Sequence, residues 1–262
     1  MWPQTIRPFQ VVVAFLATLP ATSSAFGNAR VVDNSRHVLN AEESRGPWEF
    51  GRAARTAIFF GGVPKPPNPI KVVQKLIGGG GPRQNIAPGE VMYTPTGNPL
   101  KLQWGSLDDV VMGGASKSSL NEATGVWSGT IITAGGGFAG VRTKLLVPPL
   151  DLSACSGVVL RVSGGKGQRV KLILRDDEDW NGVAWTQSFD TAANGGVAEI
   201  KLPFSTFVPT KYARVVEGLR GLNTQQVTAF QLTYSKFEYN GDLNPNFSGG
   251  PFEFKIEKIG AF

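Results

Sequence analysis

The chain contains one cysteine and one histidine, and this scarcity excludes several kinds of site. A single cysteine, Cys155, rules out an intramolecular disulfide framework and a zinc site built on several cysteines. A single histidine, His37, rules out a Ser-His-Asp triad, a Cys-His dyad and a multi-histidine metal site in residues 91–262. Most common hydrolase and metalloenzyme chemistries are therefore excluded before any motif is considered.

The N-terminus lacks an apolar run long enough to span a bilayer. Arg7 precedes the apolar stretch Phe9–Leu19, which is about half of the ~20 residues that a spanning helix requires. Pro20 ends this stretch, and Ser23-Ser24-Ala25 supplies small residues suited to a cleavage site. We expect residues 1–25 to be a signal peptide, with an uncleaved anchor or a mitochondrial presequence as the alternative.

The segment after the expected cleavage site is basic. Phe26 follows the site directly, and residues 26–45 contain Arg30, Arg36 and Arg45. A signal peptide followed by Phe and a basic stretch resembles the two-part plastid presequence of algae with secondary plastids. This resemblance predicts a plastid protein, for which association with thylakoids is one option. The mitochondrion and secretion are the alternatives.

The positive charge of the chain is concentrated in its first third. Residues 1–90 hold 10 Lys/Arg and 5 Asp/Glu, whereas residues 91–262 hold 16 and 15. A nucleic-acid-binding domain would carry the excess on its folded body, so we expect no nucleic-acid partner.

Residues 46–90 read as an amphipathic and Pro/Gly-rich extension. The apolar positions Phe50, Ala54, Ala57 and Ile58 follow helical spacing, which predicts about three helical turns over residues 48–60 with Arg52 and Arg55 on the other face. A proline-rich run at 64–69 and four glycines at 78–81 follow. This helix either packs on the folded domain or makes a peripheral membrane contact through residues 46–80.

Residues 91–262 are predicted to form one all-β domain. Short β-branched or aromatic runs alternate with Gly, Pro, Asn and Asp, and no helix of twelve residues is evident. We expect a two-sheet β-sandwich of the jelly-roll type, with a half-open barrel as the alternative. The nine candidate strands are Leu100–Trp104, Val126–Thr133, Val141–Leu146, Gly157–Val162, Gln168–Leu174, Ala184–Phe189, Val197–Leu202, Val227–Tyr234 and Phe252–Ile259.

Two motifs suggest ligands that their surroundings disfavour. The glycines of Gly135–Gly140 fit G-x-G-x-x-G, but a strand-like segment follows where a dinucleotide site needs a helix, so a turn or a close backbone approach is expected. The run Asp177–Gly182 resembles the start of a calcium loop, but Ser188 stands where the bidentate glutamate belongs. We therefore predict no metal and no cofactor, although a structural calcium stays open.

A carbohydrate-binding jelly roll of the secretory route is the alternative function. Trp180 and Trp185 could form a platform for sugar stacking, and core packing is the competing role for Trp185. Paired carboxylates for glycoside hydrolysis are not evident beyond Asp108-Asp109 and the 176–179 cluster.

The most specific segment is Asp109-Val-Val-Met-Gly-Gly-Ala-Ser116. It resembles the Asp-x-Val-Met-Gly-Gly-x-Ser signature of the complex I intermediate-associated protein 30 family, and further matches follow in the family's order from about Leu100 to Phe262. These matches are Trp104, Trp127-Ser-Gly129, Gly136–Arg142, Asp151-Leu-Ser153, Leu160-Arg-Val162, Leu174-Arg175, Leu202-Pro-Phe204, Phe207-Val-Pro209 and Gly250–Ile259.

The resemblance implies a galactose-binding-like jelly roll without enzymatic activity or small-molecule substrate. It implies a role in assembling a membrane complex, either respiratory complex I or a photosynthetic complex, through binding to subunits or assembly intermediates. Some plastid relatives add a Rossmann domain, for which this chain has no room. The family-signature residues that we take as candidates for partner binding are Trp104, Asp109, Met112, Gly113, Gly114, Ser116, Phe138, Gly140 and Arg142.

Structural roles can also be expected for the signature. Met112 is predicted to be an apolar plug, and Gly113-Gly114 a tight turn with positive φ or close backbone approach. Asp109 and Ser116 are expected to cap that turn, and Arg142 to pair with Asp109.

Overall fold

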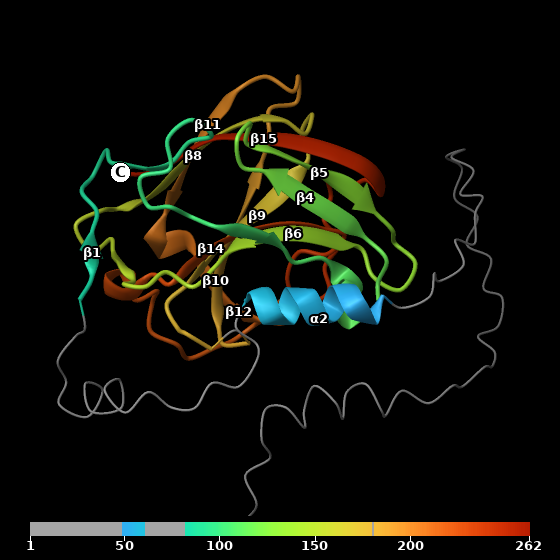
Figure 1. The fold of residues 1–262 in the computed structure, drawn as a ribbon, viewed down its shortest axis with the longest axis horizontal. Helices are drawn as coiled ribbons and strands as arrows, with labels where there is room; N and C mark the ends of the chain where they lie inside the picture. The colour runs from blue at the N-terminus through green and yellow to red at the C-terminus, as the bar shows by residue number, and fades with distance from the viewer. Residues whose placement is uncertain (1–48, 61–81, 180) are drawn as a thin grey trace, which may run out of the picture. The chain divides into compact units, whose positions relative to one another are not determined.

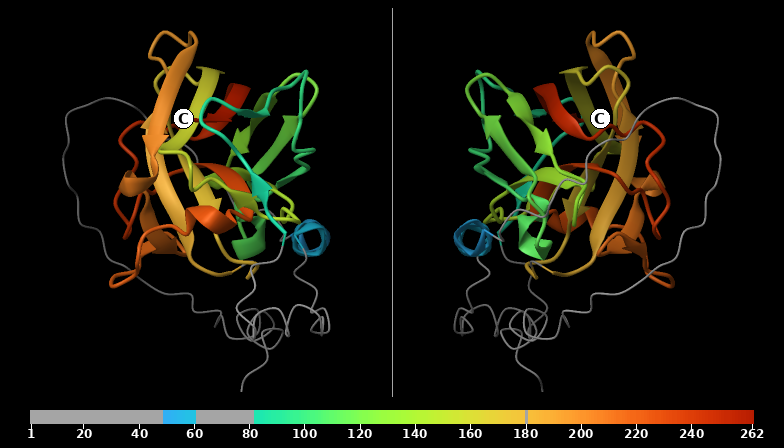
Figure 2. Two further views of the ribbon diagram at one scale, coloured as in Figure 1. Left: turned by 90° about the vertical axis from the view of Figure 1, so that its left-hand side faces the viewer. Right: turned by 90° about the vertical axis from the view of Figure 1, so that its right-hand side faces the viewer.

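The computed structural model describes residues 49–60, 82–179 and 181–262, all within the unit Glu43–Phe262. Two antiparallel sheets pack face to face around a shared apolar core (Figures 1 and 2), so the predicted all-β sandwich is confirmed. The predicted signal peptide (1–25), the transit-like segment (26–45) and the Pro/Gly-rich run lie outside the described residues. No helix in the described part of the chain is long and apolar enough to cross a membrane.

The six-stranded sheet has β15 near its centre and β11 and β4 at its two edges, and β2 pairs with β15 off the main path. In β15, alternate side chains such as Phe252, Phe254 and Ile256 are buried, while Glu253 and Lys255 are exposed. The strands of this sheet are β2 (Val91–Tyr93), β4 (Lys117–Asn121), β5 (Val126–Ile131), β8 (Gly157–Gly164), β11 (Ala198–Pro203) and β15 (Gly250–Ala261).

The seven-stranded sheet follows the order β13-β12-β10-β9-β14-β6-β3. Both faces of its central strands are largely buried: Phe230, Leu232 and Tyr234 of β14 face the core, and Gln231 and Thr233 are buried on the opposite face. Its strands are β3 (Trp104–Ser106), β6 (Phe138–Thr143), β9 (Arg169–Arg175), β10 (Ala184–Asp190), β12 (Val208–Lys211), β13 (Arg214–Val215) and β14 (Ala229–Ser235).

Short elements complete the described fold. The strands β1 (Gln84–Asn85) and β7 (Leu150–Asp151) form a separate parallel pair. Three single 3-10 turns are also present: η1 (Asp109–Met112), η2 (Phe204–Thr206) and η3 (Thr224–Gln226).

Eight of the nine predicted strands lie within three residues of their predicted bounds, but Leu100–Trp104 is mostly wrong. Only Trp104 of that run enters a strand, because the chain turns before it. Lys101 adopts φ 50°, and the Asn98 side chain bonds both the N–H and the carbonyl of Leu102 at 2.8 Å. The sequence analysis missed β1, β2, β4, β7, β12 and β13. Each has five residues or fewer and follows the ladder of a neighbouring strand rather than a strong pattern of its own.

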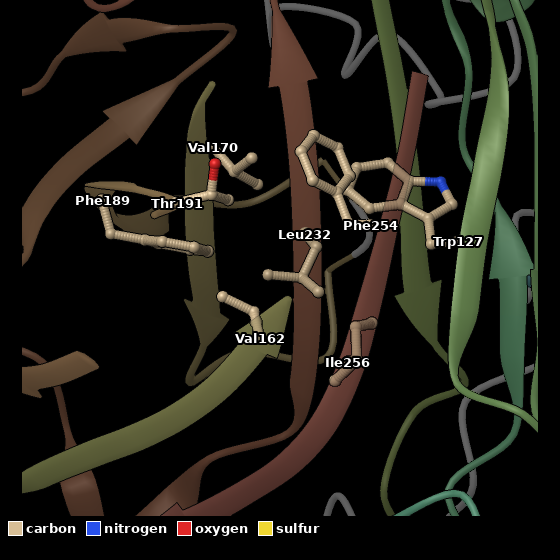
Figure 3. Close-up of a pocket in the computed structure, with 8 residues that line it drawn as sticks. All are labelled: Trp127, Val162, Val170, Phe189, Thr191, Leu232, Phe254 and Ile256. Atoms are coloured by element: carbon tan, nitrogen blue, oxygen red, sulfur yellow. The ribbon is translucent and has the colours of Figure 1, made fainter. Parts of the chain in front are cut away.

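The core between the sheets contains a cluster of aromatic rings and a small apolar void. Trp127, Tyr234, Phe252 and Phe254 pack with ring centroids 5.2–5.6 Å apart. The void lies beside this cluster and is lined almost wholly by hydrocarbon, which marks it as a packing gap rather than a ligand site (Figure 3). Its lining residues are Trp127, Val162, Val170, Phe189, Thr191, Leu232, Phe254 and Ile256.

The predicted helix is present as α2 (Phe50–Phe59) and packs on the sandwich beside η1 (Figures 1 and 2). The predicted orientation of its faces was partly wrong. Arg52 points toward the body, where it contacts Asp108, while Ile58 is 63% exposed. An ion pair and hydrogen bonds to groups in the body therefore fix the helix face, not apolar periodicity alone.

Candidate functional site

The signature segment forms one tight turn at the edge of the sandwich. The turn η1 spans Asp109–Met112 and ends at Gly113, whose φ is 86°. The N–H of Gly113 donates to the Val110 carbonyl at 3.2 Å, and that of Gly114 to the Asp109 carbonyl at 2.9 Å. The predicted turn is confirmed, with positive φ at Gly113, a backbone conformation in which a side chain is strained.

The carboxylate of Asp109 organises this turn from inside. Asp109 is fully buried, and its two oxygens accept four hydrogen bonds. Ser116 donates its N–H at 2.9 Å and its hydroxyl at 2.7 Å, which confirms the predicted cap. The N–H groups of Gly137 and Phe138 donate at 2.7 and 3.3 Å from the loop that precedes β6. The carboxylate therefore ties two segments that lie about twenty residues apart in the sequence.

Two glycines leave the room that this buried carboxylate needs. A Cβ added at Gly114 or at Gly136 would overlap the Asp109 carboxyl group. The glycine-rich run at 135–140, which resembles a nucleotide motif, thus serves the close backbone approach that we expected. Gly140 is also confined, because a Cβ there would stand 2.9 Å from the Leu107 carbonyl oxygen.

Asp108 is a second buried carboxylate, and its role was missed by the sequence analysis. Its oxygens accept bonds from the Ser118 N–H at 3.0 Å, the Ser118 hydroxyl at 2.6 Å and the Gly140 N–H at 3.3 Å. Arg52 of α2 adds an ion pair at 3.2 Å. Burial raises the pKa of Asp108, while these donors and Arg52 act to lower it. The signal available in the sequence was the Asp-Asp pair followed by Ser at 116 and 118.

The end of α2 covers the adjoining edge of the seven-stranded sheet. The Phe59 ring occupies the space where a side chain at Gly105 would lie, and Lys144 stands 4.8 Å from its centroid. The guanidinium of Arg142 lies 4.3 Å from the centroid of the Phe60 ring. Arg52 also donates to the Ser116 carbonyl at 3.1 Å, so the helix bonds the signature directly.

Arg142 is buried in β6, as its place in an apolar strand suggested, but the expected pairing with Asp109 is not what the structure shows. The contacts of Asp109 come instead from backbone N–H groups and the Ser116 hydroxyl. Burial, with repulsion from Arg175, lowers the pKa of Arg142 to about 9.

The prediction that Met112 is an apolar plug is wrong, because its side chain is 69% exposed. The buried carboxylates fill the inside of the turn, and Met112 is left on its outer side. The structure thus brings Asp109, Gly113, Gly114, Ser116 and Phe138 together at the turn around the Asp109 carboxylate, while the Gly140 N–H donates to the neighbouring carboxylate of Asp108. Arg142 lies beside them under the end of α2. Trp104 instead lies in the core, where it meets Tyr93 at 5.9 Å between ring centroids.

In the acidic loop after β9, carboxylate side chains accept hydrogen bonds from backbone N–H groups of the same loop, not from groups of the signature turn. Asp177 accepts the Asp179 N–H at 2.8 Å, and Asp179 accepts the Asn181 N–H at 3.0 Å. Trp185 is buried, and its indole N–H donates to Asp176 at 2.8 Å, so it is not available as a sugar platform. Trp180 lies outside the described residues. Within the described ranges, no group of three His, Cys, Asp or Glu residues is placed to hold a metal ion.

The two buried carboxylates have a structural role at this site. All four carboxylate oxygens of Asp108 and Asp109 already accept bonds from the protein, so they hold the turn in place. The turn exposes the Met112 side chain to solvent, and η1 contacts α2.

The chain is similar to a curated yeast protein and to solved carbohydrate-binding modules. A curated protein of Schizosaccharomyces pombe, described as uncharacterized, is 25% identical over 188 residues, which cover 65% of this chain and 83% of the yeast protein. The family 11 carbohydrate-binding module of the cellulase Lic26A-Cel5E of Clostridium thermocellum has a TM-score of 0.48 at 18% identity, covering 67% of this chain and 95% of the module. A family 11 module from the same organism, solved with a beta-1,3-1,4-mixed-linked tetrasaccharide, has a TM-score of 0.46 at 18% identity and covers 67% and 96%.

The sequence pattern of the family described as Complex I intermediate-associated protein 30 matches residues 96–256, which is more than half of the chain. This range contains the signature turn, both buried carboxylates and all strands of the sandwich from β3 to β14. The chain therefore belongs to the complex I intermediate-associated protein 30 family.

Proposed function

We propose that this protein is a non-enzymatic assembly or accessory factor for a multisubunit membrane complex, and that it acts by binding protein partners through its β-sandwich. Family membership supports this role, because the family is named for an association with intermediates of complex I. The complex is either respiratory complex I or, if the presequence directs the chain to a plastid, a photosynthetic complex. Its partners are subunits or assembly intermediates.

The observation that carries the proposal is that the Met112 side chain is exposed on a turn held in place by hydrogen bonds. Met112 is 69% exposed, although it follows a turn fixed by four hydrogen bonds to one buried carboxylate. A flexible, polarizable side chain on a preorganised turn can fit a protein surface at little entropic cost. Ile58 is a second exposed apolar side chain, 63% exposed on α2, the helix that contacts η1.

The subcellular location of the protein is part of the proposal. We infer a plastid location from Phe26 and the basic segment 26–45, with the mitochondrion as the alternative that fits the family's association with complex I. A fluorescent fusion of the full chain, compared with its Phe26→Ala variant, separates the two. Plastid import that is lost in the variant supports the first location, and mitochondrial import that the substitution leaves unchanged supports the second.

The binding role is tested by affinity purification of the tagged full chain from isolated organelles, followed by identification of co-purifying subunits. Met112→Ser should reduce recovery of those subunits at least fivefold without changing the thermal midpoint. Val197→Ser is the matched control, since Val197 is an apolar side chain 51% exposed on a different loop. Equal recovery with Met112→Ser and the unsubstituted chain would contradict the assignment of the surface.

A peripheral membrane contact through residues 46–80 is a further part of the proposal. The described portion of this region is α2, whose side chains available outside the body include Arg55 and Ile58. Flotation with liposomes of the Ile58→Ser and Arg55→Ser variants tests the outer face without removing Arg52. Unchanged flotation would leave no role for α2 in membrane contact.

The alternative, a carbohydrate-binding module, is weakened by the burial of Trp185. A glycan array probed with the full chain decides between the two functions. Saturable binding to a defined glycan would favour the alternative, and its absence together with recovery of complex subunits would favour the accessory role.

A further inference from the structure

The strand β11 forms an open edge of the six-stranded sheet. It pairs with β8 along one side, from Ala198 opposite Val162 to Pro203 opposite Gly157, and stands at the end of the strand order. In the described part of the chain no strand pairs with its other side. The unpaired N–H and C=O groups of an edge strand can form hydrogen bonds with another strand. An open edge of this kind therefore needs either protection or a partner strand.

The residues of β11 are arranged symmetrically about Ile200. The run Ala198-Glu199-Ile200-Lys201-Leu202 places an acid one position before the central residue and a base one position after it. If two copies of this strand pair antiparallel about a two-fold axis through Ile200, Glu199 of each copy lies opposite Lys201 of the other. Residues directly opposite in an antiparallel pair point to the same face and interact, so the dimer gains two cross-strand ion pairs.

The exposure of these side chains fits such a pairing. Glu199 and Lys201 are both exposed and point away from the core, whereas Ile200 faces the core from the sheet edge and is only half-buried. Within its own chain, Glu199 meets Lys258 only at 3.8 Å, and the Lys201 amine lies 5.2 Å from the Phe262 ring centroid. These contacts are weak and leave both charges free to reach a second strand, while the two Ile200 side chains would cover each other.

The opposite edge of the same sheet has no such symmetry. In β4, Lys117, Ser119 and Asn121 are the outward residues, so a two-fold pairing about Ser119 would place Lys117 opposite Asn121. This gives no ion pair and identifies Lys117 as a control position. Two copies of β11 can thus form ion pairs with each other, whereas two copies of β4 at the opposite edge cannot.

We propose that β11 is a self-association edge, through which a second copy of this chain extends the six-stranded sheet by antiparallel pairing about Ile200. Pairing over the run from Ala198 to Leu202 of each copy buries less than the roughly 1,200 Å² of a standard stable interface, so the dimer should be concentration-dependent and in rapid exchange. This edge is separate from the signature turn, so self-association and partner binding can occur together.

Charge exchange in the full chain tests the proposal by analytical ultracentrifugation over a range of concentrations. Glu199→Lys and Lys201→Glu should each raise the dimer dissociation constant about tenfold or more, because each creates two like-charge contacts per dimer. The double variant Glu199→Lys/Lys201→Glu should restore the dimer. Mixing the two single variants should give a heterodimer, because each then supplies the charge that the other requires.

Three results would overturn the proposal. They are a chain that stays monomeric at every concentration, a dimer that neither single variant weakens, and single variants that do not associate on mixing. Lys117→Glu, which changes an exposed lysine on the opposite edge, should leave the dissociation constant unchanged. The thermal midpoints of all variants are measured alongside, so that loss of folding is distinguished from loss of the interface.

Discussion

The chain contains Asp-Asp twice, at Asp108-Asp109 and at Asp176-Asp177, and the two pairs lie in very different surroundings. The first pair is buried, and its oxygens bind groups that are distant in the sequence, such as Gly137 and Arg52. The second is partly or fully exposed, and Asp177 caps an N–H only two residues away. The first pair therefore connects distant segments through both residues. In the second pair only Asp176 does so, through the Trp185 indole N–H at 2.8 Å and the Asn223 N–H at 2.9 Å, whereas Asp177 is a local turn element.

The difference teaches what a buried carboxylate requires. Burying a charge without partners is very costly, so every oxygen of the first pair needs hydrogen-bond donors. The backbone positions that pack directly against the carboxyl group must also lack a Cβ, because a Cβ there would overlap it. Gly114 and Gly136 meet the second requirement, and Ser116 and Ser118 much of the first. The exposed carboxylate of Asp177 needs neither, because water solvates it.

The sharpest test of this comparison is the isosteric pair Asp109→Asn and Asp177→Asn. Both oxygens of Asp109 accept backbone N–H groups, so an amide NH₂ faces a donor whichever way it is turned. We expect a loss of about 3 kcal/mol in the free energy of unfolding for Asp109→Asn. For Asp177→Asn we expect less than about 0.5 kcal/mol. Urea denaturation of both variants measures this, and equal losses would contradict the comparison.

The second test concerns the room around the buried carboxylate. Gly114→Ala should cost roughly 2 kcal/mol, because its Cβ overlaps the Asp109 carboxyl group. Gly113→Ala meets no atom within 4 Å but forces a side chain into positive φ, which costs about 1 kcal/mol. Thermal unfolding ranks the two, and a larger effect at Gly113 would show that backbone strain matters more than carboxylate packing.

The third test asks how much α2 contributes to the buried pair. Arg52→Met removes the ion pair to Asp108 and the bond to the Ser116 carbonyl, which should cost about 1.5 kcal/mol given that Arg52 retains some solvent contact. Arg55→Met is the control, since Arg55 is exposed and its guanidinium donates to the Gly51 carbonyl within the helix. Limited proteolysis within α2 should be accelerated by the first substitution only.

The fourth test extends the comparison to a buried cation on the seven-stranded sheet. Lys171 is 5% exposed and donates to the carbonyls of Phe237 and Glu238, and burial lowers its pKa from 10.5 to about 8. Between pH 8 and 10.5 the unfolded chain therefore binds more protons at this residue, so stability rises with pH. From pH 8 to 9 the gain should be about 1 kcal/mol relative to Lys171→Met.

Chemical denaturation of both proteins at pH 7, 8 and 9 measures this gain. If the free energies of unfolding of the two proteins change with pH in parallel, Lys171 titrates near its ordinary pKa in the folded state. Its burial then does not destabilise the charged form.

The sequence alone determined the fold class, eight of the strands, the helix and the position of the signature turn. These features rest on local information: periodicity fixes which face of a strand is apolar, and glycines and prolines mark where the chain turns. The hydrogen-bonded cap between Asp109 and Ser116 could also be predicted from the sequence, because the two residues belong to one turn.

The tertiary structure decided the environment of each charged side chain. The periodicity of α2 placed Arg52 outside, but a buried carboxylate at Asp108 turned it inward, and the same carboxylates left Met112 exposed where an apolar plug was expected. The partners of Asp109 at Gly137 and Phe138 belong to a different loop, so no local pattern could reveal them. The physical reason is that a buried charge is satisfied by whichever donors the packed sheets bring close, and their identity depends on the assembled fold rather than on neighbouring residues.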